Sequence, residues 1–357
     1  MPSNLRVVIA MSGGVDSSVA AALLVEQGYQ VIGMMLRLWS EAGHEDENRC
    51  CTPDAMVQAR SVAAILGIPF YAIDAQKIFR DTVVQSFIDG YRRGDTPNPC
   101  LVCNRLVRWG NLYARARALD AEFLATGHYA RIQQDQEGCY QLVKGVDPTK
   151  DQSYVLYMLN QEQLSHTLLP LGSLTKAQVR QLARQYNLPV AEQSESQDLC
   201  FLASEDYRSF LARHAPEVYQ PGPIINRQGE TLGNHNGLAH FTIGQRKGLG
   251  LSSREPLYVL EKDLSQNALI VGVQEELGGL EFTAGDINWT TGTAPDGPIR
   301  AQVKIRYKGR EVWAEVIPLQ DRSACVILDH PLRDITPGQA AVFYHGDIVL
   351  GGGIIQA

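Results

Sequence analysis

The chain has 357 residues, which is enough for two or three domains, and its formal net charge is −7. Apolar residues make up 45% and charged residues 20% of the chain, the proportions of a folded globular protein, which excludes a disordered or fibrous chain. No apolar segment approaches the ~18 residues needed to span a membrane, and the first residues lack the order of a signal peptide. We therefore expect a cytoplasmic protein with no membrane partner. The negative charge also argues against non-specific nucleic-acid binding, which relies on Lys and Arg contacts to phosphates.

In the first third of the chain, short apolar runs alternate with stretches of helical periodicity. This alternation predicts a parallel sheet covered by helices, whose ligands bind at the carboxyl ends of the strands. The expected strands are 7–10, 30–36, 70–73 and 123–126, and the expected helices are 17–26, 54–66 and 78–93.

The character of the chain changes after the Pro-Gly-Pro of residues 221–223. Helical periodicity before that point covers 161–164 and 175–186, and Ser204 is a candidate cap for a helix to residue 213. Beyond it, glycines and short alternating strands predict a β-rich module and then a closed or sandwiched all-β domain. The predicted domains are an α/β nucleotide-binding catalytic domain (1–205), a small β-rich central domain (206–277) and a barrel-like C-terminal domain (278–357).

The turn Ser12-Gly13-Gly14-Val15-Asp16-Ser17 lies between the first expected strand and the first expected helix. Unpaired N–H groups and the helix dipole make such a junction a phosphate site, and Gly13 and Gly14 permit close approach of the backbone. Ser12 and Ser17 add hydroxyl donors, and Asp16 is a candidate magnesium ligand. The alternative is a glycine-rich turn in an unrelated α/β domain. We expect a nucleotide site built from Ala10, Met11, Ser12, Gly13, Gly14, Val15, Asp16, Ser17, Leu36 and Gly127, with His128 as a further candidate.

No Lys follows Gly14, whereas the phosphate loop of kinases and GTPases needs one to reach the terminal phosphates. This argues against γ-phosphoryl transfer. The turn instead resembles that of the PP-loop superfamily, which implies cleavage of ATP between the α and β phosphates.

Seven cysteines are an odd number, and they fall as Cys50-Cys51, Cys100-x-x-Cys103 and the separate Cys139, Cys200 and Cys325. In a reducing compartment this pattern favours catalytic or metal-binding roles over a disulfide framework. A thiolate is a nucleophile and can carry a persulfide sulfur. The alternative for Cys200 is a buried apolar role beside its neighbours, and Cys50-Cys51 receives no role.

Six motifs in order resemble the tRNA-specific 2-thiouridylase family over nearly the whole chain. They are Ser12–Ser17, Asn98-Pro99-x-x-x-Cys103-Asn104, Thr126-Gly127-His128-Tyr129, Lys150-Asp151-Gln152-Ser153-Tyr154, Gln197-Asp198-x-Cys200-Phe201 and Gly244-Gln245-Arg246-Lys247-Gly248. The resemblance implies that ATP with Mg²⁺ adenylates the C2 oxygen of the wobble uridine of tRNA. Sulfur then replaces that oxygen to give 2-thiouridine.

The resemblance also implies roles for individual residues. Cys200 would accept a persulfide from an upstream sulfur-carrier protein, Cys103 would be the nucleophile that liberates the sulfur or forms a transient disulfide with Cys200, and Asp16 would help place magnesium on pyrophosphate. The implied tRNA contacts are Asn98, Pro99 and Cys100 against the target base, together with His128, Lys150, Asp151, Gln152, Arg306, Tyr307 and Gln339. Lys304, Arg306 and Lys308 alternate along an expected strand, 303–307, and would project from one face.

Two sets of alternatives remain open. Many members of the family have Asp where this chain has Cys100, so Cys100, Cys103 and Cys200 are alternative ligands of a 4Fe-4S cluster with one open iron. A zinc site is disfavoured because no second Cys-x-x-Cys or His pair has suitable spacing. Among other functions, an amide-forming ligase would share the loop but would not require the two cysteines. An RNA-binding or sulfur-carrier module would bind a nucleotide without turnover.

Overall fold

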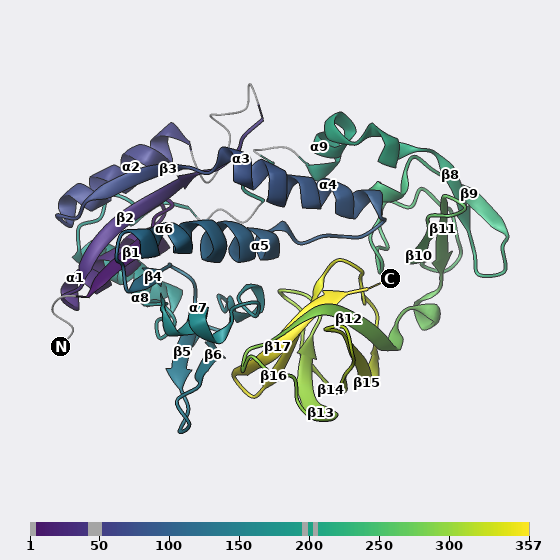
Figure 1. Ribbon diagram of the computed structural model, residues 1–357. Coiled ribbons are helices and arrows are strands. Elements are labelled where there is room, and N and C mark those ends of the chain that lie inside the picture. Colours follow the sequence, from purple (N-terminus) through teal and green to yellow (C-terminus); the bar gives the residue numbers. More distant parts are fainter. Residues whose placement is uncertain (1–4, 42–51, 195–198, 203–205, 357) are drawn as a thin grey trace.

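The computed structural model describes residues 5–41, 52–194, 199–202 and 206–356. Cys50, Cys51, the Gln197-Asp198 pair and the candidate cap Ser204 lie outside these residues. Figure 1 shows a helix-covered sheet at the N-terminal end, a small sheet at the opposite side and a barrel beside both. In the described part of the chain, no helix is both long and apolar enough to cross a membrane.

A five-stranded parallel sheet, in the order β3-β2-β1-β4-β7, forms the frame of the N-terminal domain. Because β2 and β4 lie on opposite sides of β1, the strand order reverses there, and such a switch point leaves a crevice at the carboxyl ends of the strands. The strands are β1 (Arg6–Ala10), β2 (Gln30–Arg37), β3 (Phe70–Asp74), β4 (Phe123–Ala125) and β7 (Thr167–Leu168).

Helices cover both faces of this sheet. On one face α1 (Val15–Glu26), α2 (Pro53–Ile65) and α8 (Lys176–Gln185) share a core with it. The other face packs on Trp109 and Leu112 of a long helical stretch. This stretch consists of α5 (Pro99–Val102), the π-helical η3 (Cys103–Leu112) and α6 (Tyr113–Ala118). The expected helix 78–93 corresponds to α3 (Gln76–Phe79), the π-helical η2 (Arg80–Val84) and α4 (Gln85–Arg92). The described residues also form the helices α7 (Gln161–Ser165) and α9 (Tyr207–His214).

The central domain is a four-stranded sheet in the order β10-β11-β8-β9. Its core contains Ile224, Leu269 and Val271, all fully buried. The strands are β8 (Gly222–Ile225), β9 (Thr231–His235), β10 (Tyr258–Asp263) and β11 (Ala268–Gly272).

The C-terminal domain is a barrel, because the sheet order β12-β15-β14-β13-β16-β17 is closed by pairing of β12 with β17. The hairpin of β5 (Ala130–Gln134) and β6 (Tyr140–Lys144) comes from the N-terminal domain and extends this sheet through β17. The predicted fold class is therefore confirmed. The barrel strands are β12 (Gly279–Trp289), β13 (Ile299–Lys304), β14 (Val312–Pro318), β15 (Ala324–Leu332), β16 (Ala340–His345) and β17 (Ile348–Ile355).

The expected strand 303–307 was wrong in its extent. Strand β13 ends at Lys304, and the chain then turns, with the Gly309 N–H donating to the Arg306 carbonyl at 2.9 Å. Arg306 and Tyr307 thus lie in the turn and do not share a strand face with Lys304, because the pairing of β13 with its neighbours ends at Lys304, opposite Val342.

The barrel core gives a direct test of the fold. Phe343 is fully buried among the apolar side chains that fill the barrel, so Phe343→Ala should lower the free energy of unfolding of this domain by about 3–5 kcal/mol. Urea denaturation followed by barrel-domain tryptophan fluorescence measures the change. The control, Ile327→Ala on the exposed outer surface of the same barrel, should have a much smaller effect. Equal losses would contradict the assigned core.

Candidate functional site

The turn after β1 is a preformed loop at the crevice. Gly13 has a φ of +76°, and a Cβ there would lie 2.3 Å from the Ala55 carbonyl oxygen, so this position requires glycine. The Ser17 hydroxyl accepts from the Ser12 N–H at 3.1 Å and contacts the Gly14 carbonyl at 3.2 Å. Gly14 is the N-cap of α1 and offers no capping side chain, so the first-turn N–H groups of α1 remain available to an anion.

The loop after β4 lies directly against the start of α1. A Cβ on Gly127 would lie 2.8 Å from the Ser17 nitrogen, so only glycine permits this approach. The Tyr129 hydroxyl then donates to Asp16 Oδ1 at 2.7 Å. The structure thus brings together the predicted residues of the first loop and Gly127, while Leu36 lies half-buried near the end of β2.

Lys176 also belongs to this site, although none of the sequence motifs includes it. Its Nζ lies 2.7 Å from Asp16 Oδ1 and 2.9 Å from Oδ2, and its side chain is only 12% exposed. It is the first residue of α8, which Thr175 caps through a reciprocal hydrogen-bond pair with Gln178. A cation in the first turn opposes the helix dipole, and this mismatch is the sequence signal for a function at Lys176.

His128 is held neutral between two polar partners. Its Nδ1 lies 2.7 Å from the Thr126 hydroxyl, and its Nε2 lies 3.2 Å from the guanidinium of Arg108. Burial, and then the charge of Arg108, lower the pKa of His128 well below its ordinary value. Because Arg108 is an obligatory donor, Nε2 accepts and the ring proton resides on Nδ1. Arg108 belongs to the helix that begins at Cys103, so its contact with His128 links this loop to that helix. Within the helix, Arg108 also donates to Asn104 Oδ1 at 2.7 Å.

Cys103 and Cys200 belong to one apolar cluster. Cys103 is 8% exposed at the start of η3, and Cys200 is partly buried against the same cluster. Phe201 anchors the second cysteine, because its ring packs against Phe87 and Phe210 at centroid distances of 5.3 and 5.5 Å. The structure therefore brings the two predicted sulfur-handling residues into one environment.

Cys100 lies in a different environment from Cys103. It is exposed, and it is within electrostatic reach of Tyr307 of the barrel domain, since burial and then the charges of Asp151 and Cys100 raise the pKa of Tyr307 to about 12. Among the described residues, no three His, Cys, Asp or Glu side chains lie close enough to hold a metal ion. Cys100, Cys103 and Cys200 do not fit a cluster site in this conformation.

Several predicted tRNA contacts make hydrogen bonds within the protein. Asn98 accepts from the Cys100 N–H at 3.1 Å and so caps α5. Asp151 is buried, and its carboxylate accepts from the N–H groups of Gly145 and Ser153 and from the Ser153 hydroxyl. These contacts give the two side chains structural roles, and their tRNA roles remain predictions.

Other predicted contacts tie segments of the chain together. Gln152 Oε1 accepts from the Tyr129 N–H at 3.0 Å, which joins the segment of Lys150 to the nucleotide crevice. Arg306 donates to the Ile243 carbonyl at 3.2 Å and to the Thr336 hydroxyl at 2.9 Å.

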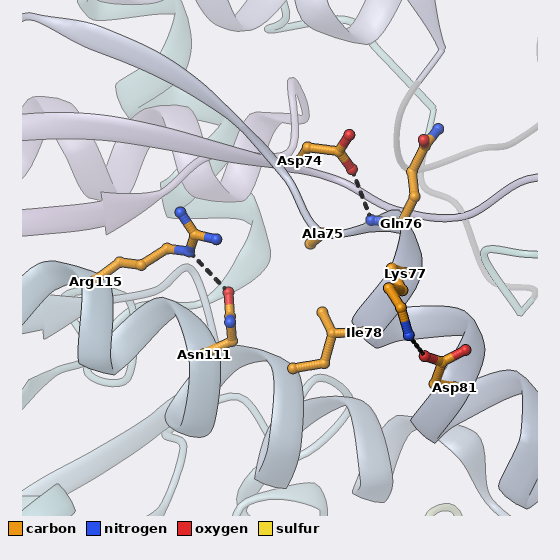
Figure 2. A pocket seen from close by; sticks show the side chains of 8 residues that line it. All are labelled: Asp74, Ala75, Gln76, Lys77, Ile78, Asp81, Asn111 and Arg115. Atoms are coloured by element: carbon orange, nitrogen blue, oxygen red, sulfur yellow. Dashed lines mark hydrogen bonds and ion pairs between the residues drawn. The ribbon is translucent and has the colours of Figure 1, made fainter.

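A cavity of about 540 Å³ opens at the carboxyl end of β3, at the edge of the sheet. Figure 2 shows that its polar side chains pair locally: Asp74 with the Gln76 N–H at 3.0 Å, Arg115 with Asn111 at 3.0 Å, and Lys77 with Asp81. The cavity lies two strands away from β1 and contains none of the loop residues. It is therefore separate from the crevice.

A parallel sheet with a Ser-Gly-Gly loop and an open helix N-terminus at its switch point defines an α/β protein of the PP-loop nucleotide-binding class. Three family models match the chain: "tRNA methyl transferase HUP domain" over residues 5–204, "tRNA methyl transferase PRC-barrel domain" over 208–273 and "Aminomethyltransferase beta-barrel domain" over 280–355. The tRNA-specific 2-thiouridylase MnmA of Magnetococcus marinus is 47% identical over 99% of this chain and all of its own length. That of Moorella thermoacetica is 48% identical over 98% of this chain and 99% of its own. The chain belongs to the tRNA-specific 2-thiouridylase family, which confirms the resemblance.

Among solved structures, a 4-thiouridine synthetase in complex with RNA and ATP aligns with 59% of this chain and 50% of its own. Its sequence identity is 14% and its TM-score 0.35, and we draw nothing from so distant a similarity.

The protonation state of His128 is testable. Its ring should stay neutral through the range around pH 6.5 in which an ordinary histidine titrates, so its NMR resonances, assigned with His128→Gln, should not titrate there. The unfolded chain takes up a proton at this residue near pH 6.5 while the folded protein does not. The free energy of unfolding therefore falls as the pH drops below about 6.5, and His128→Gln should weaken this dependence. A titration midpoint near 6.5 in the folded protein would contradict the assignment.

Proposed function

We propose that this protein is an ATP-dependent tRNA-uridine 2-sulfurtransferase that adenylates the C2 oxygen of the wobble uridine and replaces it with persulfide sulfur. The observation that carries this proposal is the combination of two sites in one domain. The first site is the loop at the start of α1, which offers N–H groups to an anion. The second site is the apolar cluster that contains both cysteines. Helix η3 connects the two sites, because it carries both Cys103 and Arg108. Family membership supports the same reaction, since the relatives bear the name of tRNA 2-thiouridylases.

The crevice suits the cleavage of ATP between its α and β phosphates. The first-turn N–H groups of α1 face the position where pyrophosphate leaves, and a leaving group gains most from donors that are already oriented. Asp16 supplies the carboxylate for the magnesium that accompanies ATP, and its partner Lys176 supplies a cation. Lys176 thus takes the place of the lysine that the loop itself lacks.

Lys176 should therefore contribute to ATP affinity. A charge-assisted bond to phosphate is worth about 1.5–3 kcal/mol, so Lys176→Met should weaken ATP binding by roughly 10- to 100-fold, and Lys176→Arg by less. Calorimetric titration with MgATP measures this. If Lys176 served only to neutralise Asp16, the Asp16→Asn background would abolish the effect of Lys176→Met. A loss that persists in this background supports direct phosphate binding.

Sulfur transfer follows from the two cysteines of the cluster. A carrier protein with a persulfide would transfer its terminal sulfur to Cys200. This sulfur attacks C2 of the adenylated uridine, a C–S bond forms, and AMP leaves with the former O2. The Cys103 thiolate then attacks Sγ of Cys200, which breaks the S–S bond to the base, leaves 2-thiouridine and forms a Cys103–Cys200 disulfide. A thiol reductant restores the two cysteines.

The target base must leave the anticodon stack, because O2 of a stacked uridine is inaccessible to these groups. We propose that the base lies against Asn98, Pro99 and Cys100, and that the predicted residues His128, Lys150, Asp151, Gln152, Arg306 and Tyr307 contact or orient the anticodon arm. Gln339, the last predicted residue, donates to the Thr96 carbonyl at 2.6 Å and so acts on the chain itself. The raised pKa of Tyr307, with Asp151 and Cys100 among its causes, supports a shared surface between the barrel and the helix of the cysteines.

Thiolation of unmodified tRNA by ATP and a persulfide donor tests the function. Cys103→Ser and Cys200→Ser should each lower thiolation by a factor on the order of 1,000 or more while tRNA affinity is retained. Asp16→Asn should lose AMP formation, and Cys139→Ser, a cysteine outside the cluster, is the matched control. Retained thiolation in Cys103→Ser would contradict its role.

The same preparation separates the alternatives. Iron near four per chain with iron-dependent activity would favour the cluster mechanism, whereas a persulfide trapped on Cys200 without iron would favour the two-cysteine route. Methyl transfer, which the names of two family models mention, would label tRNA from S-adenosylmethionine without forming AMP from ATP.

A further inference from the structure

The segment of residues 94–96 lies in the connection between α4 and α5. The barrel domain and the central domain both form hydrogen bonds to its backbone. From the barrel domain, the Pro337 carbonyl accepts from the Thr96 N–H at 2.9 Å, and Gln339 Nε2 donates to the Thr96 carbonyl at 2.6 Å. From β10 of the central domain, Lys262 Nζ donates to the Gly94 carbonyl at 3.0 Å. The segment is thus hydrogen-bonded at both of its ends.

Close packing accompanies these hydrogen bonds. Gly338 has a φ of +88°, and a Cβ there would lie 2.9 Å from the Cβ of Asp95. A Cβ on Gly94 would lie 2.9 Å from a methyl group of Leu264. Glycine at both positions therefore allows the segment to approach each domain closely.

Lys262 is buried at this contact, and removal of its charge from water is unfavourable. Burial lowers the pKa of Lys262 to about 8, although the negative charge of Asp95 acts in the opposite direction and raises it. Burial also raises the pKa of Asp95. The Asp95 side chain is only 18% exposed. Burial of an ammonium is unfavourable unless the group is hydrogen-bonded, so the bond from Lys262 to the Gly94 carbonyl indicates a defined position for residue 94.

The helix of the catalytic cysteine begins just after this segment. Asn98 caps α5, Pro99 is its first residue, and η3 with Cys103 follows without a break. A shift of the 94–96 segment would therefore be carried along the helix axis to Cys103.

We propose that Gln339 and Lys262 are positioning residues that clamp the 94–96 segment and thereby hold Cys103 in its apolar cluster. The clamp rests on the proposed function, since it aligns Cys103 for sulfur transfer. It gives Gln339 a role in turnover that differs from a direct tRNA contact. Loss of a positioning residue lowers kcat, whereas loss of a tRNA contact raises KM.

The test compares Gln339→Leu, Lys262→Met and the double variant, in the full chain, with the surface controls Gln320→Leu and Lys77→Met. Two quantities are measured: kcat and KM for tRNA in thiolation, and the alkylation rate of each cysteine by iodoacetamide, resolved by mass spectrometry. The alkylation rate of Cys103 needs no activity, so it reports on the clamp even where the proposed reaction fails.

We expect each clamp variant to raise the alkylation rate of Cys103 by at least fivefold, to leave that of Cys139 unchanged, and to lower kcat about tenfold with KM for tRNA within twofold. The double variant should add little to the larger single effect, because both residues hold one segment. An unchanged Cys103 alkylation rate, or a rise in KM for tRNA with kcat intact, would overturn the clamp.

Discussion

The close approach of Gly127 to the first turn of α1 is the contact on which the rest of the site depends. With no side chain at that position, the loop after β4 lies directly on the backbone of Ser17. Tyr129 can then reach Asp16, and His128 is buried beside Arg108. A single methyl group at Gly127 would separate the two strand ends and open the crevice into which the helix N-terminus points.

The same loop fixes the position of the barrel. Strand β5 begins at residue 130, immediately after Tyr129, and its partner β6 pairs with β17 of the barrel. Lys144 at the end of β6 forms an ion pair with Glu311 at 2.7 Å, with both side chains only 18% exposed, and its ammonium lies 4.6 Å from the ring centroid of Tyr344. These contacts join the barrel to the loop that follows β4.

Sequence alone predicts the features that depend on local chemistry. The Ser-Gly-Gly loop, the alternation of strands and helices, and the change to β-structure after residue 223 each follow from residues that are neighbours in the chain. Lys176 escaped prediction because its partner Asp16 lies 160 residues away, and only the strand order brings α8 beside α1. Arg306 was placed on a strand because alternation cannot reveal where a turn begins.

The role of a polar side chain is harder to predict from the sequence than the position of the loop. A polar residue in a motif serves either a ligand or the protein itself, and its neighbours in the chain do not distinguish the two. The family resemblance implies a tRNA contact for Asp151, which stays a prediction, and its carboxylate accepts three hydrogen bonds from its own chain. The distinction depends on burial, which the tertiary structure decides.

Helix η3 connects the two halves of the proposed chemistry. Cys103 at its start lies in one apolar cluster, Asn104 and Arg108 carry the polar link to the nucleotide loop, and Trp109 lies in a second apolar cluster. The π-helical turns place these side chains around one short axis, and such turns frequently occur at functional sites. A rotation of this helix would move the cysteine and the guanidinium together, so the proposed adenylation site and the proposed sulfur-transfer site would not be adjusted independently. Both would have to be correct in the same conformation, which is why the proposed clamp at the start of the helix would affect a reaction whose phosphate chemistry takes place on the other side of this helix.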